Sequence, residues 1–154
     1  MINKITSLYL DTSIFGGYYD DIFMRETRLL FEKIKADKYN VFISDLVEKE
    51  LENAPENVRK LLKDIKYQSI KVSQECRDLA DEYINENVVG ETNKDDCIHI
   101  ATATIFNVDY LVSWNYKHIV RAEKIKGYNI VNLKNKYKQL DIHSPREMEV
   151  YDDE

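Results

Sequence analysis

The sequence is poor in the residues that interrupt a folded chain. Its 154 residues include only two prolines and four glycines, too few for a flexible linker between domains. No apolar run approaches the roughly 18 residues of a membrane span, and the opening stretch MINKITSLYLD is too short and polar for a signal peptide. We therefore expect one domain over residues 1–150 with a frayed tail at 151–154, located in the cytoplasm and away from membranes.

Cysteine is scarce as well. Cys76 and Cys97 are the only two, and they show neither C-x-x-C spacing nor a histidine at the interval of a zinc site. A disulfide framework and a structural zinc are thereby excluded. Both residues are expected to be buried thiols.

Positive charge is in deficit. The chain has 28 acidic against 22 basic side chains, a formal charge of −6, so its overall field repels polyanions. Any nucleic-acid binding must come from a local patch, and the late part of the chain offers basic candidates, for which simple solvation is the alternative: Lys117, Arg121, Lys124, Lys126, Lys134, Lys136 and Lys138.

Short β-branched, aromatic or apolar runs alternate with segments of helical period. The runs predict strands at Ile5–Leu10, Val41–Ile43, Ser69–Val72, Tyr110–Ser113 and Tyr128–Val131. Helical spacing of apolar residues predicts helices around residues 23–34, 56–65, 76–84 and 97–105, and another carrying Glu50. Ser144, Pro145 and Glu147 form a helix start signal with a capping box.

This alternation is typical of βαβ units. It predicts an α/β fold in which a mostly parallel central sheet carries helices on both faces. In such sheets ligands bind beyond the carboxyl ends of the strands, so the residues directly after each predicted strand are the first candidates for a functional site.

Polar side chains gather at those positions. Asp11 and Ser13 follow the first strand, Ser113 and Asn115 follow the fourth, and Glu50 lies on the helix after the second. The acidic pair Asp95-Asp96 opens a later helix, and Asp96 borders its apolar stripe. These residues are therefore expected to converge on one rim of the sheet.

Converging carboxylates repel one another unless a cation neutralises them, and hard oxygen ligands select Mg²⁺ or Mn²⁺. Such an ion would support phosphodiester hydrolysis without a covalent intermediate. Taken singly, each residue has a simpler explanation: turn chemistry for Asp11, a solvated helix face for Glu50, and the helix dipole for Asp95 and Asp96. The joint pattern is what favours a metal site.

The chain resembles PIN-domain proteins, in particular their VapC-like bacterial branch, from Tyr9 to about Glu147. The resemblance is carried by LYLDTSIFGG, ISDLVEKEL, DCIHIATA, DYLVSWNYKHIV and IHSPREM. It implies an α/β/α sandwich with a Mg²⁺- or Mn²⁺-dependent endoribonuclease site, and often a role as the toxin of a toxin–antitoxin pair. RNA would be the substrate and an antitoxin protein the partner, while the oligomeric state stays open, with a homodimer as one candidate.

Carried over by position, the resemblance makes Asp11, Glu50 and Asp96 the metal ligands, and Asp95 has no counterpart. Where the family usually has a fourth acidic residue, this chain has Asn115, whose amide can ligate or orient water but brings no charge. We expect one firmly held ion as a result. Ser13 and Ser113 are expected to hold the carboxylates and water in place.

The RNA phosphates would meet basic residues after the fourth strand. Lys117, His118 and Arg121 are the candidates for these contacts. For His118, an ordinary structural or exposed histidine is the alternative.

Three other functions compete with a nuclease. A PIN fold with catalysis weakened or lost at Asn115 would be a scaffold that binds a protein or RNA. A phospho-acceptor receiver domain requires an acidic pair after the first strand, where this chain has Asp11 followed by Thr12. A dinucleotide-binding fold requires G-x-G-x-x-G, and Gly16-Gly17 is the only glycine cluster.

Overall fold

The computed structural model describes residues 4–90 and 94–152, with side chains described as far as residue 148. In these residues one sheet has five strands in the order β3-β2-β1-β4-β5, and every neighbouring pair is parallel. The predicted sheet is thus confirmed, and is fully parallel over the described strands. The strands are β1 (Thr6–Leu10), β2 (Tyr39–Ser44), β3 (Gln68–Ile70), β4 (Tyr110–Val112) and β5 (Asp141–His143).

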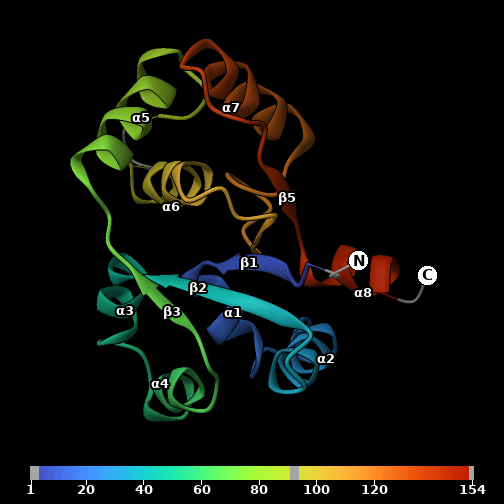
Figure 1. Cartoon of the computed structure of the whole chain (residues 1–154). Helices are drawn as coiled ribbons and strands as arrows, with labels where there is room; N and C mark the ends of the chain where they lie inside the picture. The colour runs from blue at the N-terminus through green and yellow to red at the C-terminus, as the bar shows by residue number, and fades with distance from the viewer. Residues whose placement is uncertain (1–3, 91–93, 153–154) are drawn as a thin grey trace.

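Helices cover both faces of the sheet, which gives the three-layer α/β/α arrangement (Figure 1). α5, α6 and α7 lie on one face, and α1, α2 and α4 lie on the other. The strand order explains this division. The chain adds β2 and β3 on one side of β1 and then returns to add β4 and β5 on the other side. Because crossovers between parallel strands are right-handed, reversing the direction along the sheet places the connecting helices on the opposite face. The helices are α1 (Thr12–Gly17), α2 (Met24–Lys35), α3 (Asp45–Leu51), α4 (Glu56–Lys63), α5 (Gln74–Asn85), α6 (Lys94–Ile105), α7 (Ala122–Lys134) and α8 (Pro145–Asp152).

One predicted strand is wrong. Tyr128–Val131 lies inside α7, where Tyr128 and Val131 are buried three residues apart while Ile130 is exposed. Its β-branched run is one face of a helix, and packing overrides the local strand preference. The actual last strand, β5, has only Ile142 buried, so three residues give no alternating pattern to recognise.

Other local predictions are confirmed. Cys76 and Cys97 are free, buried thiols. At α8 the Ser144 backbone N–H donates to Glu147 Oε1 (3.0 Å), and the Glu147 N–H donates to Ser144 Oγ (3.3 Å), which is a capping box. The expected frayed tail, 151–154, lies partly outside the described residues. No helix in the described ranges is long and apolar enough to cross a membrane.

The centre of the sheet is β1, whose Leu8, Tyr9 and Leu10 are fully buried. At its amino end β1 is joined to β4 by side chains: Asp109 Oδ2 accepts from the Ser7 N–H (2.8 Å) and from Ser7 Oγ (3.1 Å), and Ser7 Oγ accepts from the Asp109 N–H (2.8 Å). This reciprocal pair ties residues from opposite ends of the sequence and fixes the register of the two strands.

The Ser7–Asp109 pair generates a pH-dependent stability. Partial burial alone would raise the pKa of Asp109, but the Ser7 hydrogen bonds and the charge of Lys4 outweigh it and lower the pKa below its ordinary value. The ionised carboxylate therefore stabilises the fold above its unfolded pKa of about 3.9. That contribution is lost as the pH falls through the lower folded pKa.

We predict that Asp109→Asn lowers the free energy of unfolding by about 1 kcal/mol at neutral pH, a figure discounted for the side chain's partial exposure. The difference should shrink as the pH falls below about 4. Urea unfolding at neutral and acid pH measures both values. Asp141→Asn, on an exposed residue that begins β5, is the control. An Asp109→Asn effect that grows in acid would contradict the assignment.

Candidate active site

The candidate site lies where the strand order reverses. β1 pairs with β2 on one side and with β4 on the other, so the loops after β1 and β4 leave toward opposite faces of the sheet. A crevice at such a point is where open α/β sheets bind ligands. Asp11 directly follows β1 and Ser113 directly follows β4, which brings residues 102 positions apart into contact.

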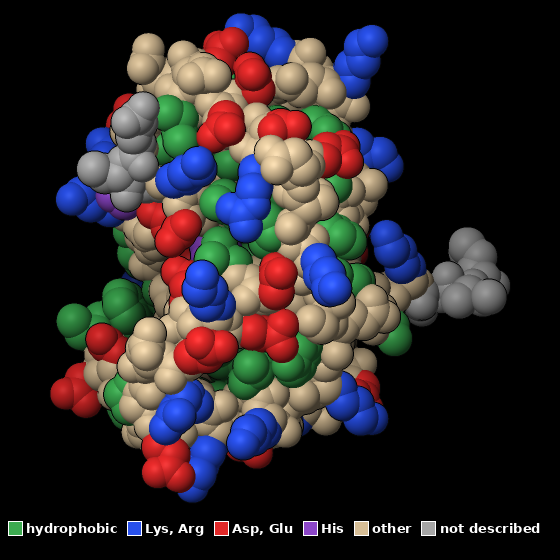
Figure 2. Space-filling view, turned by 90° about the vertical axis from the view of Figure 1, so that its left-hand side faces the viewer, with side chains coloured by type: hydrophobic (Ala, Val, Ile, Leu, Met, Phe, Trp, Pro, Cys, Tyr) green, Lys and Arg blue, Asp and Glu red, His purple; other side chains and the backbone are tan. Residues whose placement is uncertain are grey.

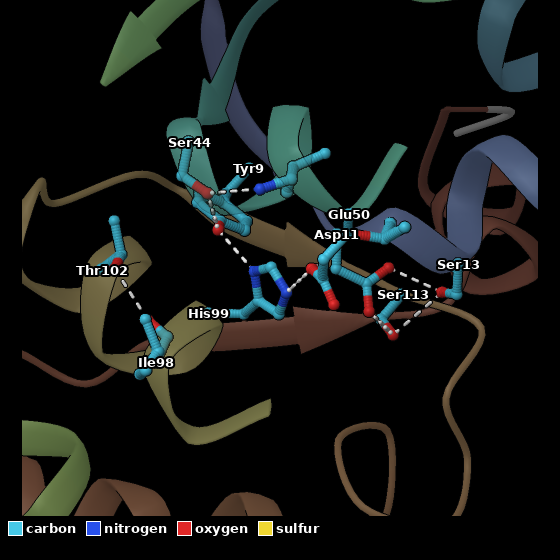
Figure 3. Close-up of polar contacts among 11 residues, drawn as sticks. Tyr9, Asp11, Ser13, Ser44, Glu50, Ile98, His99, Thr102 and Ser113 are labelled. Atoms are coloured by element: carbon cyan, nitrogen blue, oxygen red, sulfur yellow. Dashed lines mark hydrogen bonds and ion pairs between the residues drawn. The ribbon is translucent and has the colours of Figure 1, made fainter. Parts of the chain in front are cut away.

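Asp11 is buried, with 4% of its surface exposed. Its carboxylate accepts hydrogen bonds from Ser13 Oγ (2.6 Å) and from Ser113 Oγ (2.7 Å). Each serine hydroxyl in turn accepts a backbone N–H at 2.9 Å, from Trp114 and Asn115 respectively. Figure 3 shows Asp11 between the two serines. The contact that the sequence predicted for both serines is present.

Glu50 reaches the site from α3. This helix begins directly after β2 because Ser44 caps it, accepting the Val47 N–H at 3.2 Å. Glu50 Oε1 accepts from Thr12 Oγ1 and from His99 Nε2, both at 2.7 Å. In the sequence Glu50 resembles part of a solvated helix face. In the structure its carboxylate instead bonds Thr12, the residue directly after Asp11.

His99 is the site residue that the sequence reasoning missed. It is buried in α6 at 2% exposure, and both ring nitrogens are bonded: Nε2 to Glu50, and Nδ1 to the Tyr9 hydroxyl (2.6 Å), which also bonds Ser44 Oγ (2.7 Å). Figure 3 shows the ring between Tyr9 and Glu50. The sequence does contain one indication of this role: His99 lies three residues after Asp96, so the two side chains are on the same side of the helix.

Asp96 lies in the first turn of α6 and is half-buried, whereas Asp95 beside it is exposed. Burial raises the pKa of Asp96, while the charges of His99 and His118 and a hydrogen bond from the Asn115 side chain oppose that rise. The Asn115 side chain therefore contacts Asp96.

The charges of the three carboxylates act on one another. Burial raises the pKa of Asp11, and the charge of Asp96 adds to it. Burial alone would lower the pKa of His99, but its bond to Glu50 and the charges of all three carboxylates raise it. Glu50 shows the reverse: burial favours a higher pKa, and the bond and charge of His99 lower it. Three carboxylates from distant segments therefore act on one imidazole.

The donor set fits a hard divalent ion. Carboxylate oxygens with a nearby amide are the ligands that Mg²⁺ and Mn²⁺ prefer. In residues 4–90 and 94–152, however, no three Asp, Glu, His or Cys side chains already stand as a metal-holding group. Glu50 Oε1 is occupied by Thr12 and His99.

A hollow of about 500 Å³ opens beside Glu50. Its lining includes Lys49 and Arg77, which sequence reasoning did not single out, together with Asp45 and Asp95. Figure 2 shows acidic and basic side chains interspersed over the side of the molecule that carries α3, β3 and α5. This side therefore presents no electrostatic field of a single sign.

The predicted basic residues are placed differently from one another. Lys117 and Arg121 are exposed, Arg121 in an ion pair with Glu123 (3.1 Å). His118 lies close enough to lower the pKa of Asp96. Two others have structural partners: Lys124 donates to the Val88 carbonyl, and Lys134 pairs with Glu86 at 3.1 Å.

Comparison with known proteins gives a fold. No family model and no curated protein matches the chain. Among solved structures, it is similar to a chain of the VapBC2 complex from Rickettsia felis, solved bound to a promoter DNA fragment, with TM-score 0.58, 17% identity, and coverage of 90% of this chain and 98% of that one. The chain has a PIN-like fold.

A second solved structure agrees with this fold. It is a toxin–antitoxin complex from Klebsiella pneumoniae, with TM-score 0.51, 22% identity, and coverage of 71% of this chain and 88% of that one. At these identities the likeness is one of fold. The PIN-like arrangement accounts for why Asp11 and Ser113 meet, and the roles of the site residues are argued from their own geometry.

The hydrogen bonds of the Tyr9 hydroxyl, one of which holds the histidine that bonds Glu50, lead to a prediction about stability. Tyr9→Phe removes the hydroxyl that bonds both His99 and Ser44 in a buried position, and we expect it to lower the free energy of unfolding by about 1 to 3 kcal/mol. Chemical denaturation measures this. Tyr19→Phe, at a residue 41% exposed, should change stability by less than about 0.5 kcal/mol. Equal effects of the two variants would show that the Tyr9 hydroxyl bonds are not stabilising.

Proposed function

We propose that this protein is a metal-dependent endoribonuclease of the VapC-like branch of PIN-domain proteins, hydrolysing RNA phosphodiester bonds. The observation that supports the proposal is that Asp11, Glu50 and Asp96, from three distant segments, lie near one buried histidine, His99, which bonds Glu50 and whose pKa all three charges raise. The fold shared with chains of toxin–antitoxin complexes supports it.

Asp11, Glu50 and Asp96 would hold a Mg²⁺ or Mn²⁺ ion. When bound, such an ion supplies a polarised phosphoryl oxygen and a water of lowered pKa. The chain's own residues position the rest: Ser13 and Ser113 orient Asp11, His99 and Thr12 orient Glu50.

Three carboxylates bring three negative charges, one fewer than two divalent ions require. Asn115, which contacts Asp96, adds an amide where a fourth carboxylate would complete the balance. One firmly held ion is therefore the expected stoichiometry, with any second ion recruited by the substrate phosphate.

Partners follow from the same proposal. Lys117, His118 and Arg121 follow β4, with His118 close enough to Asp96 to lower its pKa, and all three would contact the RNA phosphates. Both similar structures are of toxin–antitoxin complexes, so the partner we propose is an antitoxin and the role is that of the toxin in a type II pair. RNA substrate and antitoxin would both be met in the cytoplasm.

Asp11→Asn removes one charge with almost no change in volume. We predict that it abolishes Mn²⁺-dependent cleavage of a mixed RNA pool. Without metal, the variant should be as stable as the wild type or more stable, because it relieves a buried carboxylate near Asp96. Gel analysis of RNA cleavage and thermal unfolding without divalent ions measure the two effects.

Asp95→Asn is the matched control, since Asp95 is exposed beside Asp96 and makes the same change in net charge. It should retain cleavage. Undiminished cleavage by Asp11→Asn would overturn the proposed active site. Loss of cleavage in both variants would show that overall charge, rather than the site, controls activity.

A specific observation also favours a second candidate function, a scaffold with weak or absent catalysis. The fourth acidic position holds Asn115, and no preformed three-ligand metal group occurs in the described ranges. Such a scaffold would bind a protein or RNA through the same fold. Absence of both RNA cleavage and divalent-dependent stabilisation in the wild type would favour it over the nuclease.

Asn115 offers a direct test of the charge balance. Asn115→Asp adds a fourth carboxylate beside Asp96, and we predict tighter binding of Mn²⁺, by about tenfold, measured by calorimetry. Asn53→Asp, on a residue that lines the hollow near Glu50, controls for a general increase in negative charge. Unchanged or weaker binding by Asn115→Asp would place residue 115 outside the metal site.

A further inference from the structure

Three aromatic rings from two distant segments meet at one edge of the candidate site. Phe23, just before α2, stacks on Trp114 with ring centroids 4.2 Å apart and planes at 21°. Tyr116 lies against both, with its centroid 6.2 Å from Trp114 and 6.5 Å from Phe23. We refer to these three residues as the aromatic ledge.

The base of the ledge is rigid. Trp114 is 5% exposed, and its ring N–H donates to Thr27 Oγ1 at 2.8 Å. The ring packs directly on the backbone of α1, since a Cβ added at Gly17 would lie 2.6 Å from it. The Tyr116 N–H donates to the Trp114 carbonyl at 3.0 Å. A ligand meeting this surface would find it already ordered.

The outer ring of the ledge is left in water. Tyr116 is 42% exposed, Phe23 is half-buried, and the adjoining Ile22 is 73% exposed. A single exposed aromatic residue is ordinary. An ordered stack of rings that ends in an exposed one is a surface suited to a flat, apolar ligand.

One short segment, residues 113–116, contributes both to the ledge and to the contacts with the carboxylates. Ser113 and Asn115 contact Asp11 and Asp96, while the residues that alternate with them, Trp114 and Tyr116, form the ledge. The backbone N–H of Trp114 donates to the same Ser13 hydroxyl that bonds Asp11. Tyr116 directly follows Asn115, whose side chain bonds Asp96, and the Cα atoms of these two neighbours are about 3.8 Å apart.

We propose that the aromatic ledge stacks an unpaired base of single-stranded RNA next to the phosphodiester held at the carboxylates. The inference rests on the proposed nuclease function and adds to it a surface that would stack a base of the substrate. A base can stack on a side chain only when it is not inside a duplex. The chain's charge of −6 makes attraction of phosphates weak, so stacking supplies affinity that the overall field does not.

The test measures binding separately from cleavage. In an Asp11→Asn background, which leaves RNA intact, a labelled short single-stranded RNA is titrated and its anisotropy followed. Tyr116→Ala should weaken binding about tenfold, and Tyr116→Phe, which keeps the ring, should restore it to within about twofold. Phe106→Ala is the matched control: Phe106 is 41% exposed but lies beyond the far end of α6, about 15 Å from Asp96.

A base-free polyanion separates stacking from charge. Inorganic polyphosphate should bind all these variants equally. Trp114 is the only tryptophan, so its fluorescence should change with RNA and not with polyphosphate. Equal RNA affinity of Tyr116→Ala and its background would overturn the proposal, and a protein partner would then be the occupant of the ledge. Parallel weakening of RNA and polyphosphate would overturn it as well. Neither result depends on whether the wild type cleaves RNA.

Discussion

The pairing of β1 with β4 is the constraint on which the rest of the molecule depends. It joins the beginning of the chain to a strand 102 residues later, and side chains secure it at both ends: Ser7 with Asp109 at the amino ends, Asp11 with Ser113 at the carboxyl ends. Closing so long a loop costs entropy, and a buried central strand with polar bonds at each end offsets that cost. The same pairing creates the point at which the strand order reverses. The candidate site is therefore a consequence of where β4 joins the sheet.

Buried charge is the second constraint. Burial opposes ionisation of Asp11 and Asp96, yet the fold keeps both beside Glu50. Both carboxylates raise the pKa of His99, which is held between Glu50 and Tyr9. The charges of three carboxylates therefore act on one internal imidazole, and in the described part of the chain no three such side chains already form a metal-holding group.

The sequence was sufficient for the first four strands, and for placing Asp11 directly after β1, Glu50 on α3 and Asp96 in the first turn of α6, because strand ends and helix starts have local signals. It was insufficient where packing decides. Residues 128–131 have strand preference but form the covering face of α7, and β5 has too few buried residues to show a period. His99 was missed because a histidine in an apolar stripe resembles core packing until Glu50 and Tyr9, from other segments, are seen on its two nitrogens.

The four residues after β4 show how one segment can serve two surfaces. Ser113 and Asn115 contact Asp11 and Asp96, while Trp114 and Tyr116 lie against Phe23. The backbone N–H groups of Trp114 and Asn115 donate to the hydroxyls of Ser13 and Ser113, and the same two hydroxyls donate to the Asp11 carboxylate. One pair of serines therefore holds both this segment and Asp11 in place.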